Sequence, residues 1–116
     1  MGYEIELSYD LGITSSVRDI IIKKAYRCSC EFHYIQYELE GRRRQIYKKR
    51  AIITFIFSKD GLPMQSFIRY IKNIKAVYIE CISTDTGSFE IIYASPKYLS
   101  IMNKDQAQKY KKKKKN

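Results

Sequence analysis

Residues 46–58 read IYKKRAIITFIFS and contain the longest apolar run of the chain, Ala51–Phe57. A continuous run of this kind is typical of a strand that is buried on both faces, as in the middle of a sheet. It is about a third as long as a membrane-spanning helix, so we expect no membrane-embedded segment here. The sequence therefore predicts a central strand over residues 46–58.

Four more strands are predicted around this one. At the N-terminus, Tyr3, Ile5 and Leu7 alternate with Glu4 and Glu6, which indicates a strand with one solvent-exposed face. The other three strands are predicted over residues 31–40, 76–83 and 89–93. Residues 31–40 and 46–58 are joined through an arginine-rich turn.

Three helices are predicted. Apolar residues recur at three- and four-residue spacing over residues 16–28, where Ser16 and Asp19 have the spacing of a capping box, with Thr14 and Ser15 as other candidate caps. A second helix begins near Pro63. Its predicted buried stripe is Met64, Phe67, Ile68 and Ile71, with Ile74 as a further candidate. A third helix is predicted from Pro96 towards Tyr110.

The resulting order is β-α-β-β-α-β, followed by a hairpin strand and a terminal helix. This order predicts an α+β fold of the ferredoxin-like, split βαβ type, with an antiparallel sheet and both crossover helices on one face. The predicted strand order is fourth, first, third and second, with the fifth strand outside the fourth. We expect one domain over residues 1–103, and a helix end with a disordered polybasic tail over residues 104–116.

Two short segments carry the positive charge of the chain. Gly41–Arg50 contains six cations: Arg42, Arg43, Arg44, Lys48, Lys49 and Arg50. Lys104–Asn116 contains seven lysines against Asp105 and contributes a net charge of +6. Taking these two contributions of +6 from the total of +10 leaves −2 for the rest of the chain. Charge that is segregated in this way indicates an anionic partner.

The two cationic segments predict a module that binds DNA or RNA without sequence specificity. The cations of Gly41–Arg50 would hold phosphates, and Tyr47 would stack on a base. The tail lysines would add a diffuse contact: Lys111, Lys112, Lys113, Lys114 and Lys115. The alternatives are a solvated turn, and a tail that serves as an address signal, a solubility device or a contact with anionic lipid.

The sheet face away from the helices is predicted to be acidic, with aromatic and aliphatic residues among the carboxylates. Carboxylates repel phosphates, and Ile52 and Thr54 occupy the two positions at which the RNA-recognition motif carries stacking aromatics. The exposed Tyr34, Tyr78 and Ile82 instead indicate a protein contact, including a homodimer or larger homo-oligomer. The alternative is that the terminal helix covers this face with Tyr98, Leu99 and Met102.

No constellation for catalysis or metal binding is predicted. Cys28, Cys30, His33 and Cys81 have the residue types of a zinc site, but the predicted topology separates Cys81 from His33. His33 lacks the partners of a catalytic triad, and residues 10–16 lack the arginine of an acylphosphatase-like phosphate loop. We therefore expect a protein that is not an enzyme and has no cofactor. The odd number of cysteines argues against a disulfide framework and favours an intracellular location.

Three stretches, YEIELSYDL, AVYIECI and IIYASPKYLSIM, resemble small uncharacterised proteins encoded by giant (nucleocytoplasmic large) DNA viruses. The resemblance implies a viral origin, in the host cell or the virion, and assigns no functional residue.

Overall fold

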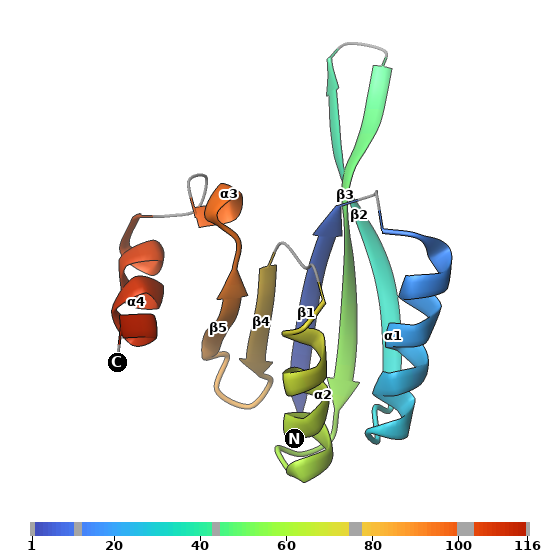
Figure 1. The fold of residues 1–116 in the computed structure, drawn as a ribbon, viewed down its shortest axis with the longest axis vertical. Helices are drawn as coiled ribbons and strands as arrows, with labels where there is room; N and C mark the ends of the chain where they lie inside the picture. The colour runs from blue at the N-terminus through green and yellow to red at the C-terminus, as the bar shows by residue number, and fades with distance from the viewer. Residues whose placement is uncertain (1, 11–12, 43–44, 75–77, 100–103, 116) are drawn as a thin grey trace.

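The computed structural model describes residues 2–10, 13–42, 45–74, 78–99 and 104–115. They form a five-stranded antiparallel sheet with the strand order β2-β3-β1-β4-β5 (Figure 1). The strands are β1 (Tyr3–Asp10), β2 (Phe32–Arg42), β3 (Gln45–Phe57), β4 (Tyr78–Ser83) and β5 (Phe89–Ala94). The α+β class and the predicted strand order are confirmed, and this arrangement is compatible with the ferredoxin-like plan.

β3 is a central strand, as its apolar run predicts. It pairs with β1 on one side and with β2 on the other. Ile53 and Phe55 are fully buried and point to the same face as Ile5 and Leu7 of β1. These residues form the floor of the main core.

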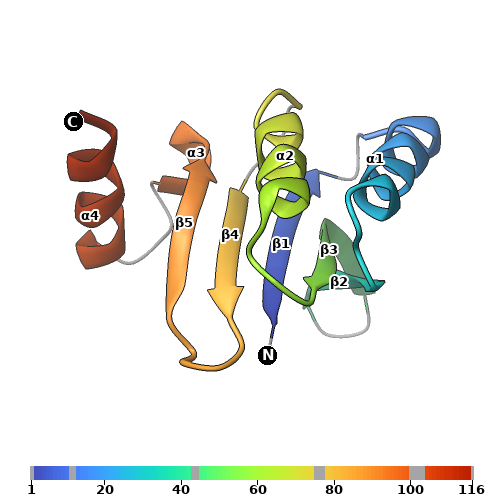
Figure 2. The ribbon, with the colours of Figure 1, turned by 90° about the horizontal axis from the view of Figure 1, so that it is seen from below.

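Two helices cover that face of the sheet (Figure 2). They are α1 (Ser15–Arg27), which contributes Ile21 and Ala25 to the core, and α2 (Leu62–Ile71). The predicted stripe of α2 is confirmed, since Met64, Phe67, Ile68 and Ile71 are all buried. The ring of Phe67 packs edge-on against Phe55, with their centroids 4.8 Å apart.

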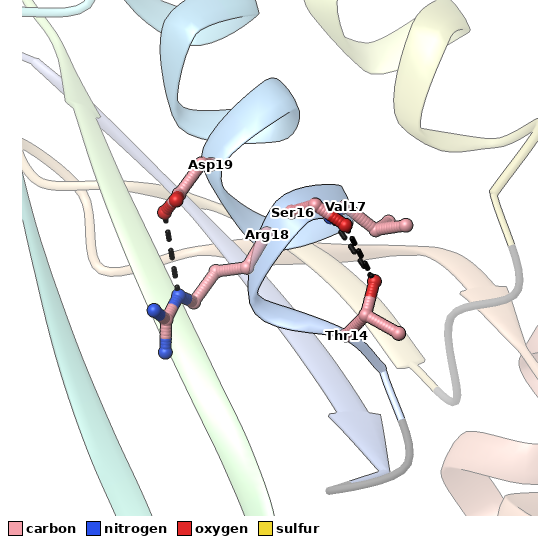
Figure 3. Close-up of polar contacts among 5 residues, drawn as sticks. All are labelled: Thr14, Ser16, Val17, Arg18 and Asp19. Carbon is pink, nitrogen blue, oxygen red and sulfur yellow. Dashed lines mark hydrogen bonds and ion pairs between the residues drawn. The ribbon is translucent and has the colours of Figure 1, made fainter.

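The N-cap of α1 is Thr14, and the predicted capping box is not formed. The Thr14 hydroxyl accepts a hydrogen bond from the backbone N–H of Val17 at 3.3 Å and lies 3.0 Å from the Ser16 hydroxyl (Figure 3). Asp19 faces the Arg18 guanidinium at 3.7 Å instead of turning back to Ser16. The helix begins at Ser15 because Thr14 supplies the first acceptor.

The C-terminal region differs from the prediction in two ways. In place of one helix there are α3 (Pro96–Leu99) and α4 (Lys104–Lys115), with residues 100–103 outside the described part. The run of lysines is helical, although a disordered tail is predicted. Ala107 and Tyr110, which lie three positions apart on α4, are both buried and anchor one side of this helix.

Candidate functional site

The cation-rich segment lies on a two-stranded ribbon that projects beyond the sheet (Figure 1). Pairing of β1 with β3 ends at Asp10 and Arg50. Beyond the end of β1, from the pair Leu39–Lys48 outwards to the pair Arg42–Gln45, β2 and β3 pair with each other. We call residues 39–49 the cationic ribbon. A β-bulge between Glu38 and Leu39 marks its base.

Five of the predicted phosphate-binding cations belong to this ribbon. Arg42 and Lys48 are paired in its ladder, and Lys49 lies in β3 at its base. Arg43 and Arg44 lie outside the described residues, as do the side chains of Arg42, Tyr47, Lys48 and Lys49. Arg42 and Gln45 form the pair of the ribbon that lies farthest from the β1–β3 pairing.

The sixth cation, Arg50, is paired within the chain, which favours a positioning role over the predicted phosphate contact. Its Nε donates to Glu38 Oε2 at 2.8 Å, and its Nη2 contacts the same oxygen. Its guanidinium carbon also lies 4.8 Å from the centroid of the Tyr98 ring. With 14% of its side chain exposed, Arg50 joins the base of the ribbon to α3.

Tyr78 is covered, so it is not the exposed interface residue that the sequence predicts. Its ring stacks on Tyr98 with centroids 4.4 Å apart, and only 6% of the residue is exposed. The Tyr78 hydroxyl donates to Glu80 Oε2 at 2.6 Å. Burial, followed by this hydrogen bond and the Glu80 charge, raises the pKa of Tyr78.

The alternative prediction, in which the terminal region covers the face, is right for Tyr98 and Leu99, while Met102 lies outside the described residues.

The rest of this face stays open and acidic. Cross-strand pairing gives one row of Phe32, Ile56, Glu4, Ile82 and Phe89, and a second row of Tyr34, Thr54, Glu6, Glu80 and Ile91. We call these two rows the acidic face. Tyr34 and Ile82, the other two predicted interface residues, are half-buried in it.

Two groups at the centre of the acidic face are unfavourably placed. Glu6 lies directly across from Glu80, and desolvation, then Glu80, then Glu4, raises the pKa of Glu6. Thr54, the neighbour of Glu6 on β3, is fully buried, and its hydroxyl has no hydrogen-bond partner. Like charges opposite each other and an unpaired buried hydroxyl both cost stability.

The lysines of α4 lie beyond the edge of the sheet. α4 stands beside β5 in both views (Figures 1 and 2), and Tyr110 packs in a cluster with Tyr78 and Ala94. Lys111 and Lys112 are exposed. The side chains of Lys113, Lys114 and Lys115 lie outside the described part of the structure. The segment for which a tail contact is predicted is therefore a helix.

The cysteine and histidine residues are used for packing. Cys28 and Cys30 are buried at the end of α1, and Cys30 Sγ donates to the Phe32 carbonyl at 3.1 Å. His33 Nδ1 lies 2.7 Å from the Tyr26 hydroxyl, a pairing that the sequence reasoning missed. Among the described residues no group of three or more His, Cys, Asp or Glu is arranged to hold a metal ion.

A polar cavity of about 340 Å³ lies between α2 and the β4–β5 hairpin. Its lining includes the charged and polar residues Asp60, Gln65, Lys72 and Glu90, together with Met64. Gln65 donates to Asp60 at 2.6 Å. The cavity also includes Cys81, whose thiol pKa is raised by burial and then by Asp60 and Glu80, so this thiol is not an activated nucleophile.

No family model matches the chain, and no curated protein matches it either. Among solved structures the chain is similar to a phage SAM lyase in complex with S-methyl-5'-thioadenosine, at 13% identity and a TM-score of 0.43. The match covers 80% of this chain and 90% of that one. The expectation that the chain is not an enzyme is corrected by this neighbour, which is an enzyme, although so distant a match assigns no activity here. The resemblance to proteins of giant DNA viruses stays a prediction.

No helix in the described part of the chain combines the length and the apolar character needed to cross a bilayer.

Proposed function

We propose that the chain binds nucleic acid through backbone phosphates, with the cationic ribbon as the main contact and α4 as a second one. The observation that carries the proposal is the projection of the ribbon, which extends past the last pairing of β1 with β3 and carries five cations outside the Arg50–Glu38 pair. A two-stranded ribbon fits into a groove or follows a phosphate backbone. Arginine adds bidentate contacts to phosphate oxygens.

The base of the ribbon supports this role. Arg50 is held by Glu38 and by the Tyr98 ring, so the ribbon leaves the sheet from a fixed point rather than from a loose loop. A contact group that is already oriented loses less conformational entropy on binding. We therefore assign Arg50 to positioning, and Arg42, Arg43, Arg44, Lys48 and Lys49 to phosphate contact.

The helical lysine run supports a second contact. Lys109 and Lys112 are both exposed and lie three positions apart on α4, so their like charges are neighbours on the helix surface and repel each other. A bound polyanion removes this repulsion and releases its own counterions at the same time. The lysines of α4 therefore favour a phosphate backbone over solvent alone.

The proposal implies little sequence readout. The acidic face repels phosphates, and its centre holds Glu6 and Glu80 in place of stacking aromatics. Binding through charge alone is independent of base identity and depends strongly on salt. DNA and RNA are both compatible with this chemistry.

An electrophoretic shift series with duplex DNA, single-stranded DNA and RNA tests the proposal. The ribbon variant replaces Arg42, Arg43 and Arg44 with Gln, and the matched control replaces the exposed Lys23, Lys59 and Arg69 with Gln. Both variants lose three charges, but only the ribbon variant should lose most of the binding. Equal weakening by both variants would show that net charge alone attracts the oligonucleotide.

A further inference from the structure

The composition of the acidic face is that of a surface that binds a partner. Glu4, Glu6 and Glu80 lie at the centre of its two rows and are half-buried, while Phe32 and Phe89 at the two ends are 57% and 48% exposed. An apolar surface with half-buried charge at its centre is not a typical solvent-facing surface. It resembles one side of a protein interface whose other side must bring positive charge.

Thr54 is an independent sign that this face is incomplete. Its neighbours Ile53 and Phe55 are in the core, so its own side chain points to the acidic face, where it lies between Tyr34 and Glu6. It is fully buried, and its hydroxyl has no partner. An arriving group can supply the missing hydrogen bond itself or through a side chain that it moves. Either way the hydrogen bond lowers the free energy of the complex.

A symmetric dimer through this face is disfavoured by its charge. Two copies placed face to face would set the carboxylates of Glu4, Glu6 and Glu80 against the same three groups of the partner copy. Like-charge juxtaposition of this kind costs several kcal/mol at an interface. The partner segment must therefore be cationic, and the chain itself carries such a segment in its ribbon.

We propose that the acidic face binds the cationic ribbon of a second copy of this chain. The ribbon combines Ile46 and Tyr47 with arginine and lysine, so it offers apolar groups that match those of the acidic face and the cationic groups that the face lacks. The free-standing part of the ladder runs from Leu39 and Lys48 to Arg42 and Gln45 and extends away from its own sheet, which makes it available to a neighbour. The contact is heterologous, because ribbon and face are different surfaces.

Heterologous contacts repeat, so wild-type chains should form rings or open filaments rather than stop at a dimer. Raised salt should dissociate them, because the contact is largely electrostatic. Nucleic acid and a second chain compete for the same ribbon. Self-association nevertheless does not depend on the proposed function, since it needs only the ribbon and the acidic face.

Mixing two complementary variants tests the contact. The face variant carries Glu4→Gln and Glu6→Gln, which leaves the Tyr78–Glu80 hydrogen bond in place. The ribbon variant carries Arg42→Gln, Arg43→Gln and Arg44→Gln. By sedimentation velocity, each variant alone should associate at least about tenfold more weakly than wild type. An equimolar mixture should give a dimer of one copy of each, because the intact ribbon of one meets the intact face of the other.

A control with Asp19→Asn and Glu31→Gln, which are exposed on other surfaces, should associate as wild type does. A wild-type chain that stays monomeric at low salt, a face variant that still associates, or a mixture that stays monomeric would each overturn the inference. Oligonucleotide binding by the face variant separates the two proposals. If that variant binds the oligonucleotide as tightly as wild type, nucleic-acid binding by the ribbon does not depend on association. If wild type associates but binds no oligonucleotide, only the proposed function fails.

Discussion

The guanidinium of Arg50 lies over the ring of Tyr98, 4.8 Å from its centroid, and so connects the base of the cationic ribbon to the helix that follows β5. Tyr98 in turn stacks on Tyr78, whose hydroxyl donates to Glu80. A continuous set of contacts therefore runs from the ribbon to the centre of the acidic face. The two surfaces that we assign to binding share this support.

Replacing Tyr98 with Ala should destabilise the fold. The change removes a ring stack worth about 0.5–1.5 kcal/mol and a cation–π contact worth about 0.5–1 kcal/mol. Urea unfolding should therefore show a loss of about 1–2.5 kcal/mol in the free energy of unfolding. Tyr98→Phe keeps both ring contacts and should remain within about 0.5 kcal/mol of wild type. An alanine variant as stable as wild type would show that α3 does not hold the base of the ribbon.

Tyr78 should make stability sensitive to high pH. Its pKa is raised in the folded state above the ordinary value of 10.0, so the folded protein keeps this proton when the unfolded chain loses it. The stabilisation is complete below pH 10.0 and is lost as the pH rises towards the folded-state pKa. Stability measured across this range should fall more steeply for wild type than for Tyr78→Phe.

A Tyr78→Phe variant should also lose stability at neutral pH. It lacks the hydrogen bond to the Glu80 carboxylate, and such charge-assisted bonds contribute about 1.5–3 kcal/mol. Equal slopes for the two proteins above pH 10 would contradict the assignment of the raised pKa to Tyr78.

Glu6→Gln should stabilise the monomer at neutral pH. The folded-state pKa of Glu6 is raised above its ordinary value of 4.5, so ionisation of Glu6 opposes folding. The penalty is absent below pH 4.5 and complete once the pH exceeds the folded-state pKa. Removing a like-charge cross-strand neighbour should add about 0.2–1 kcal/mol at neutral pH. Thermal unfolding in high salt, where association is suppressed, measures the difference, which should vanish in acid; a difference that persists there would have another cause.

Thr54→Val should be neutral or stabilising, which is unusual for a polar-to-apolar change in a strand. The hydroxyl of Thr54 is buried without a partner, and removing such a group recovers up to about 1–3 kcal/mol. Chemical unfolding of the two proteins gives the comparison. A clear loss of stability in the valine variant would show that the hydroxyl is hydrogen-bonded after all.

Much of the fold follows from patterns along the chain. The apolar run Ala51–Phe57 predicts the central strand, and the stripe from Met64 to Ile71 predicts the face of α2 that is buried. The first pattern is a continuous run short enough for a buried strand, and the second has the three- and four-residue spacing of a helix. The strand order then follows from the right-handed connections of the split βαβ plan.

The candidate site does not follow from patterns along the chain, because it depends on contacts between distant segments. Arg50 belongs to a run of cations, and only its pairing with Glu38, beside a β-bulge, separates it from the others. The burial of Tyr78 depends on where Tyr98 packs, and periodicity does not specify that. The lysine run alone predicts disorder, whereas Ala107 and Tyr110 attach it to the protein as a helix.

The salt dependence of oligonucleotide binding tests the central claim most directly. Fluorescence anisotropy of a labelled duplex, measured at several salt concentrations, gives the slope of log K against log salt for wild type and for the Arg42, Arg43 and Arg44 to Gln variant. If the ribbon holds phosphates, the variant should bind more weakly, and its slope should be shallower by about 0.9 for each arginine contact that is lost. An affinity and a slope that are the same for both proteins would contradict the account.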